Sequence, residues 1–199
     1  MAAVTAGEHP LFSVRRRTGV LGALLAGCVL LPVDADTGLS VFDLVLLVLR
    51  DDVVSGLLLG LTLGLPYVFG LLVALHGLGR GRFGAWGIRG ATDLLIVEVF
   101  LLGLQLAKGD HGIAPLSLLG VSGSALLARL GESFAARVRP TPVTFFMRWG
   151  ALLIAATFGW LRLQFIGGDV RPGIAITATA VCAALLAATA AVPRAQPTA

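Results

Sequence analysis

The sequence predicts an all-α, polytopic membrane helix bundle of about six transmembrane helices, with a short interfacial helix after the first span. Two observations lead to this fold class: 57% of the 199 residues are hydrophobic and only 13% are charged, whereas about a quarter of the residues in soluble domains are charged. Such a chain has too few charges to coat a water-soluble core. We therefore expect one transmembrane domain over residues 1–199, with 1–17 as a cytoplasmic N-terminal segment and 194–199 as a short tail.

Six apolar segments account for the predicted helices. A helix needs about 20 predominantly apolar residues to cross the hydrocarbon core of a bilayer. The candidate spans are bounded by charged residues, Gly or Pro, and cover residues 18–33, 53–79, 91–107, 112–130, 148–166 and 173–193. Only a few residues around Lys108 join the third span to the fourth, so these two spans are expected to form a tight antiparallel hairpin.

The basic residues predict the orientation, because Lys and Arg near the ends of spans stay on the cytoplasmic side. If the N-terminus is inside, only Arg50, Lys108 and Arg171 fall in outer segments, and Arg162 falls inside the fifth span. Six spans with both termini cytoplasmic therefore predict a multi-pass protein of the plasma (inner) membrane, with the lipid bilayer as its first partner. The basic residues form short clusters and no continuous face, so no nucleic-acid partner is expected.

The segment between the first two spans, residues 37–50, is too short to cross a bilayer and is flanked by aspartates. We expect it to lie flat at the outer interface or to re-enter the membrane partway. In the alternative interpretation, this segment and the second span form one long tilted helix.

The first span has two possible fates. Arg15–Arg17, followed by an apolar stretch and Leu25-Ala26-Gly27-Cys28, resembles a lipoprotein signal peptide, whose cleavage would leave Cys28 lipidated. The apolar run continues through Val33, however, whereas the apolar region of a signal peptide ends at the cleavage site. We expect the span to be retained.

Three glycines at four-residue spacing, Gly56, Gly60 and Gly64, form a flat strip on one face of the second span. Helices in lipid associate through close packing of small residues and through a few polar contacts. We expect another helix backbone to lie against this strip.

Polar residues inside the spans are the next candidates for a site. Glu98 lies near the middle of the third span, and Gln105 follows two turns later on the same face. A carboxylate at that depth is costly and indicates a functional site that carries protons or binds a polar ligand. In the structural alternative, Glu98 is neutral or pairs with Arg162. The expected role of Arg162 is to anchor the fifth span by reaching the outer interface.

No cofactor or metal site is expected from the three histidines and two cysteines. His76 and His111 are not part of a ligand cluster. Cys28 and Cys182 lie inside apolar runs, where a thiol behaves as a small hydrophobe, and their spacing predicts neither a disulfide framework nor a zinc site.

One motif is of a catalytic type. The fourth span contains Gly120-Val121-Ser122-Gly123, and here the chain resembles the rhomboid intramembrane proteases. That resemblance covers about residues 18–193 and implies a six-helix core in which Ser122 is the nucleophile of the fourth helix. It also implies that Gly120 and Gly123 let neighbouring helices approach, and that the basic linker 77–90 joins the second helix to the third.

The chain departs from that family in its catalytic partners, because a serine hydroxyl needs an adjacent base to become a nucleophile. Rhomboids supply a histidine from the sixth helix, and residues 169–175 contain none. The family's second-helix asparagine also has no counterpart, since the chain has no asparagine. We therefore expect a pseudoprotease without enzymatic activity that binds transmembrane helices of client proteins. The alternatives are a small transporter or channel subunit that uses Glu98, and a structural subunit of a membrane complex.

Overall fold

The computed structural model of the chain describes residues 10–79, 81–108, 114–135, 142–164 and 173–190. Within those ranges the fold is all-helical, with seven α-helices and no β-strand. The helices are α1 (Pro10–Gly27), α2 (Val41–Asp51), α3 (Val53–Gly77), α4 (Gly81–Ala107), α5 (Ala114–Ala135), α6 (Val143–Gln164) and α7 (Ile174–Ala190), and a short 3₁₀ helix, η1 (Cys28–Leu30), follows α1.

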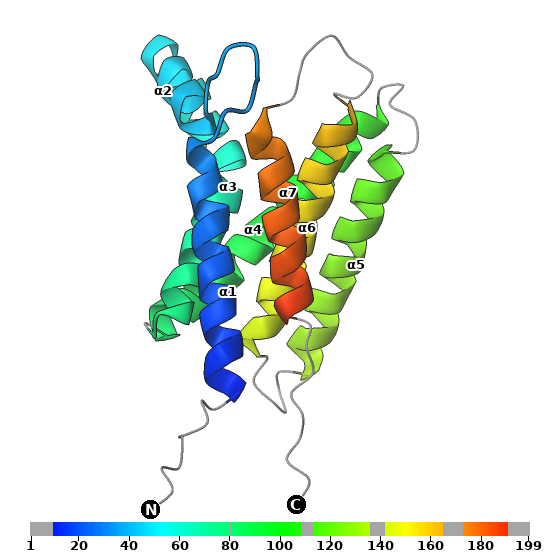
Figure 1. Cartoon of the computed structure of the whole chain (residues 1–199). Helices are drawn as coiled ribbons and strands as arrows, with labels where there is room; N and C mark the ends of the chain where they lie inside the picture. Colours follow the sequence, from blue (N-terminus) through cyan, green and yellow to red (C-terminus); the bar gives the residue numbers. More distant parts are fainter. Residues whose placement is uncertain (1–9, 80, 109–113, 136–141, 165–172, 191–199) are drawn as a thin grey trace, which may run out of the picture.

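All helices except α2 run along one bundle, and α2 lies at one end of it (Figure 1). The first helix packs against α3 and α7, and α4 packs against α3, α5 and α6. Among the described elements, α5 contacts α4 and α6 alone, so α5 is an edge helix. The start of α1 and the end of α7 lie at the same end of the bundle (Figure 1).

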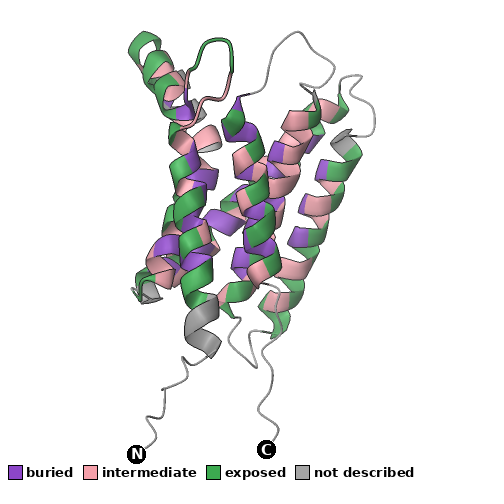
Figure 2. Ribbon diagram, in the orientation of Figure 1, coloured by how far each residue is buried: buried purple, intermediate pink, exposed green. Residues whose placement is uncertain are grey.

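Two segments of the described chain are long and apolar enough to span a membrane, Phe83–Ala107 of α4 and Val143–Leu163 of α6. Two apolar helical segments are shorter: Leu63–Gly77, which is part of α3, and Ile174–Ala190, which is α7. Buried residues face the interior of the bundle, while exposed residues cover its outside (Figure 2). Many of the exposed residues are large and apolar, and Leu94 on α4 and Leu127 on α5 are examples. An apolar exterior of this kind suits a lipid environment.

The predicted linker over residues 77–90 was wrong, because α4 begins at Gly81, ten residues before the expected start of the third span. Glycine weakens a helix by only about 1 kcal/mol relative to alanine, and here it permits close packing. A Cβ atom on Gly84 would lie 2.9 Å from the Cβ atom of His76, and one on Gly87 would lie 2.6 Å from a methyl carbon of Leu72. The glycines of this basic segment therefore join α4 to α3.

The interfacial segment forms its own helix, α2, which begins with a capping box. The Ser40 hydroxyl oxygen accepts a hydrogen bond from the backbone N–H of Asp43 at 3.1 Å, and the Asp43 carboxylate accepts from the Ser40 backbone at 3.0 Å. Hydrogen bonds from the side chain and backbone of Ser40 hold the pKa of the Asp43 carboxyl below its usual value.

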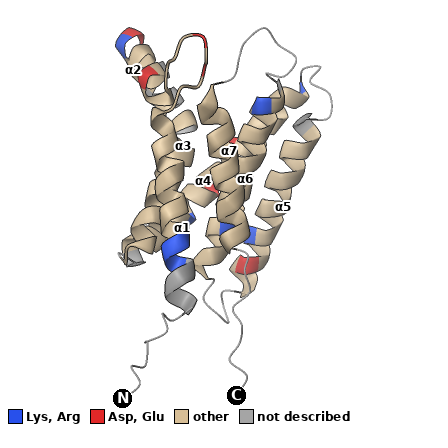
Figure 3. Cartoon of the chain, in the orientation of Figure 1, with Lys and Arg blue, Asp and Glu red and all other residues tan. Residues whose placement is uncertain are grey.

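A break at Asp52 separates α2 from α3, so the interpretation of these two segments as one long tilted helix was wrong. Asp52 is extended, with φ −146° and ψ 113°, which no continuous helix allows. The charged residues of α2 lie at one end of the bundle and the basic residues of α1 at the other (Figure 3).

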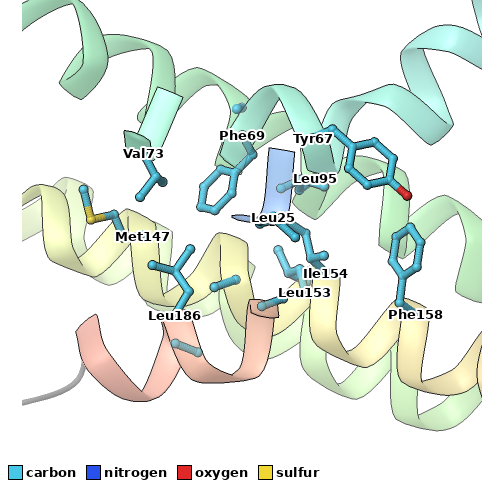
Figure 4. Close-up of a cluster of buried hydrophobic side chains, with 14 of the residues drawn as sticks. Leu25, Tyr67, Phe69, Val73, Leu95, Met147, Leu153, Ile154, Phe158 and Leu186 are labelled. Carbon is cyan, nitrogen blue, oxygen red and sulfur yellow. The ribbon is translucent and has the colours of Figure 1, made fainter. Parts of the chain in front are cut away.

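The backbones of α1 and α3 meet at glycines. A Cβ atom on Gly22 would lie 2.7 Å from the carbonyl oxygen of Gly70, and one on Gly70 would lie 2.8 Å from the carbonyl oxygen of Gly22. One turn closer to the start of α1, a Cβ atom on Gly77 would lie 2.5 Å from the Cα atom of Gly19. Next to this seam, Leu25 and Phe69 are fully buried in the core shown in Figure 4.

We predict that Gly22→Ala destabilises the protein by about 1–3 kcal/mol, because the added methyl group meets backbone atoms that cannot move independently. The measurement is thermal or denaturant unfolding in detergent.

The matched control is Gly27→Ala, since a Cβ atom there has no neighbour within 4 Å and the residue already has helical dihedral angles. Equal stabilities of the two variants would contradict the close backbone contact.

Candidate functional site

Ser122 points into the bundle from α5 and is fully buried. Its hydroxyl donates to the carbonyl oxygen of Leu118 at 2.7 Å and also lies 3.3 Å from that of Leu119. No hydrogen bond to a histidine or carboxylate is present within the described residues. The hydroxyl proton is therefore engaged by the serine's own helix, a common arrangement for serine within helices.

The helix arrangement also separates Ser122 from the helix that would carry its base. In the part of the chain that the structure describes, α5 makes no contact with α7 or with α3. His76, on α3, lies at the opposite side of α4, where its backbone carbonyl accepts two hydrogen bonds from the Arg15 guanidinium at 2.9 and 3.2 Å. His111 lies outside the described residues. The described geometry therefore gives Ser122 no activating base.

The two glycines of the motif do not bring helices together, and that expectation was wrong. Gly120 is exposed and Gly123 is half-buried, and a Cβ atom on either one would have no neighbour within 4 Å. The reason is the position of α5 at the edge of the bundle, because only one side of this helix faces α4 and α6.

The side of α5 turned away from the bundle carries three small residues among large exposed apolar ones such as Leu127. Gly120, Ser124 and Gly131 are exposed and follow one another at four and seven residues, which places them on one flank of the helix. A Cβ atom on Gly131 would also have open space around it. We call these three residues the α5 flank.

Glu98 is half-buried on α4. It lies three helical turns after Gly87, so it is on the flank of α4 that faces α3. Gln105 lies on the same flank but is exposed, and Arg162 is half-buried in the last turn of α6. No ion pair joins Glu98 to Arg162 among the described residues, so the proposed structural pairing of these two side chains is not present there.

The glycine strip of α3 packs against α2 at one end. A Cβ atom on Gly56 would lie 2.5 Å from the Cα atom of Leu49, and one on Gly60 would lie 3.2 Å from a methyl carbon of Val45. Gly64 has no neighbour within 4 Å of an added Cβ atom. The first two glycines of the strip therefore allow α2 to pack closely against α3. The third, Gly64, has no such neighbour.

An ion pair that sequence reasoning missed joins α4 to α5. The Arg129 guanidinium donates to both carboxylate oxygens of Asp93, at 2.9 and 3.3 Å, and to the Ser133 hydroxyl at 3.0 Å. It also stacks on the ring of Phe146, 5.1 Å from the centroid. Opposite charges in two spans joined by a tight hairpin were the available signal.

We predict that a serine-directed fluorophosphonate does not label the wild-type protein in native membranes, because the Ser122 hydroxyl is buried and bonded to a backbone carbonyl. Labelling is measured by fluorescence after gel electrophoresis. Adduct formation that disappears in Ser122→Ala would contradict this prediction and would indicate that Ser122 is a reactive nucleophile.

No protein-family model, no curated protein and no solved structure matches the chain. In the described residues, no group of three or more His, Cys, Asp or Glu side chains is placed to hold a metal ion.

Proposed function

We propose that this chain is a multi-pass protein of the plasma (inner) membrane with six spans and both termini in the cytoplasm. The spans are α1 and α3 to α7, and α2 lies at the outer interface. Support comes from the alignment of the helix axes along one bundle. The start of α1 and the end of α7 also lie at the same end of that bundle (Figure 1). The basic residues Arg15, Arg89 and Arg129 then lie in the inner parts of α1, α4 and α5, in agreement with the positive-inside rule.

The proposed function is that of a rhomboid-like pseudoprotease, which binds transmembrane helices of other membrane proteins without cleaving them. The observation that carries this function is the α5 flank: an edge helix with contacts to two neighbours exposes Gly120, Ser124 and Gly131 on one side. The buried and backbone-bonded state of Ser122 supports the absence of cleavage.

Small residues favour a helix as the occupant of this flank over lipid. Lipid chains are as apolar as leucine side chains, so helices in a membrane gain association energy from close backbone packing and from hydrogen bonds. An incoming helix can approach the backbone of α5 at Gly120 and Gly131, where an added Cβ atom would have open space. It would also pack against Leu127, which is 71% exposed on the same flank, and the Ser124 hydroxyl adds a polar contact. The other side of α5 is already covered by α4 and α6.

A photo-crosslinking amino acid at Ser124 tests this function in native membranes. We expect ultraviolet irradiation to form a covalent adduct with a partner helix. A second change, Gly131→Leu, places a large side chain on the same flank and should lower the adduct yield about tenfold, which corresponds to a loss of about 1.4 kcal/mol.

The matched control carries the same crosslinker at Val181, which is 52% exposed on α7. Equal adduct yields at Ser124 and Val181, or a yield that Gly131→Leu leaves unchanged, would exclude the α5 flank as the binding surface.

A second candidate function, a small transporter or channel subunit, is favoured by Glu98. This side chain is half-buried on α4 in a described interior that is mostly apolar. Ionisable groups inside a membrane are rare and mark ion or substrate pathways.

Proton flux into proteoliposomes, measured with a pH-sensitive dye, tests this second function. Transport through Glu98 predicts a flux above that of protein-free vesicles and at least about tenfold lower in Glu98→Gln, because the amide cannot exchange a proton. A wild-type flux at the level of empty vesicles would rule it out.

A further inference from the structure

Two buried hydroxyl groups in the core have no hydrogen-bond partner in the described part of the chain. The side chain of Thr179 on α7 is fully buried, Tyr67 on α3 is 4% exposed, and neither hydroxyl makes a bond of acceptable geometry. Buried polar groups are nearly always satisfied in native proteins, so an orphaned group calls for an explanation such as an unseen ion or ligand. These two hydroxyls are close enough to interact with each other, although the geometry between them is too poor for a good hydrogen bond.

The two cysteines of the chain lie near these two hydroxyl groups. The side chain of Cys28 is 3% exposed in η1, and both Thr179 and Cys182 are close enough to interact with its thiol. The Cys28 thiol donates to the Leu24 carbonyl oxygen at 3.3 Å. Residues 28 and 182 are far apart in the sequence, yet the fold brings the two thiols of the chain close enough to interact.

Backbone hydrogen bonds explain how these residues meet. The N–H of Ala175 donates to the carbonyl oxygen of Pro32 at 3.0 Å, and the N–H of Gly173 donates to that of Val33 at 2.7 Å. The start of α7 is therefore fixed against the segment that follows η1. Thr179 and Cys182 lie four and seven residues after Ala175, on the same face of α7.

The third contributor, Tyr67, is held in place by an aromatic contact. Its ring lies edge to face with that of Phe158 on α6, at 6.3 Å between centroids. Figure 4 shows the hydroxyl directed away from Phe69. We call Cys28, Cys182, Tyr67 and Thr179 the thiol cluster, which joins η1, α3 and α7.

We propose that the thiol cluster binds one Cu(I) ion, with Cys28 and Cys182 as the two sulfur ligands and with Tyr67 and Thr179 as hydrogen-bond donors to those sulfurs. The proposal goes beyond the helix-binding function and does not depend on it.

The number and type of ligands favour Cu(I). Thiolates are soft ligands that prefer Cu(I), and this closed-shell monovalent ion is stable with two sulfur ligands in a line. Zinc, in contrast, takes four ligands in structural sites, and the described residues near the cluster offer no third His, Cys, Asp or Glu.

The hydroxyl groups account for the charge of the loaded site. Both thiols lose their protons on binding, so one Cu(I) and two neutral thiols give a bis-thiolate complex of charge −1 and release two protons to water. A buried negative charge requires hydrogen-bond donors. Within the described residues the Tyr67 and Thr179 O–H groups make no hydrogen bond of acceptable geometry, and they become donors to thiolate sulfur when the ion is bound.

Competition with a coloured Cu(I) chelator tests the proposal on the full chain, purified in detergent under anaerobic and reducing conditions. We expect one Cu(I) per chain and an ultraviolet thiolate-to-copper absorption band. Cys28→Ser and Cys182→Ser should each abolish the binding that resists the chelator. Tyr67→Phe should keep the stoichiometry and weaken the affinity about tenfold, as removal of an outer-shell partner does.

Thr157→Val is the matched control, because the Thr157 hydroxyl on α6 donates to the Leu153 carbonyl oxygen and is not part of the thiol cluster. Its affinity should equal that of the wild type. X-ray absorption at the copper edge of the wild-type complex needs no variant and should show two sulfur ligands.

Copper retained by Cys28→Ser, an absence of binding by the wild type, or a copper edge dominated by nitrogen and oxygen ligands would each overturn the proposal. None of these outcomes bears on crosslinking at the α5 flank, so the two proposals fail separately.

Discussion

The contact between the backbones of α1 and α3 at Gly22 and Gly70 is the constraint on which the rest of the structure depends. In a chain with an apolar exterior, hydrophobicity does not distinguish the inside of the bundle from the outside, so close packing must do so. Because α1 lies directly against α3, the 3₁₀ helix at its end meets the start of α7. The rest of α3 then supports α2 on one side and α4 on the other, and α5 is left at the edge.

Several hydroxyl groups of the described helices share one hydrogen-bond pattern, which Tyr67 and Thr179 do not follow. Ser122, Thr157 and Thr189 each donate to the carbonyl oxygen four residues earlier in their own helix. Such bonds satisfy a polar group without help from another helix, and they remove it from any role between helices. Tyr67 and Thr179 are not satisfied in this way. They differ from the other hydroxyls in lying beside the two thiols. Their hydrogen bonding therefore depends on whether the thiol cluster holds an ion.

Much of the helical fold could be predicted from the sequence, because long apolar segments have few other stable forms when so few charges are present. The start of α4 could not be predicted, since packing of Gly84 and Gly87 against α3 extends the helix beyond its apolar segment. The side of α5 that faces the interior decides whether Ser122 is accessible, and that side depends on tertiary contacts. The meeting of Cys28 and Cys182 depends on the order in which helices pack, which no local pattern contains.

The contact between α1 and α7 has a consequence for biosynthesis. Of the two described helices that pack against α1, α3 follows it closely in the chain, whereas α7 is made much later. Until then, the surface of α1 that α7 will cover lacks that partner. Closure of the ring of helices is therefore a late and long-range event, and a chain truncated before α7 would leave α1, η1 and the inner face of α6 without their final neighbour.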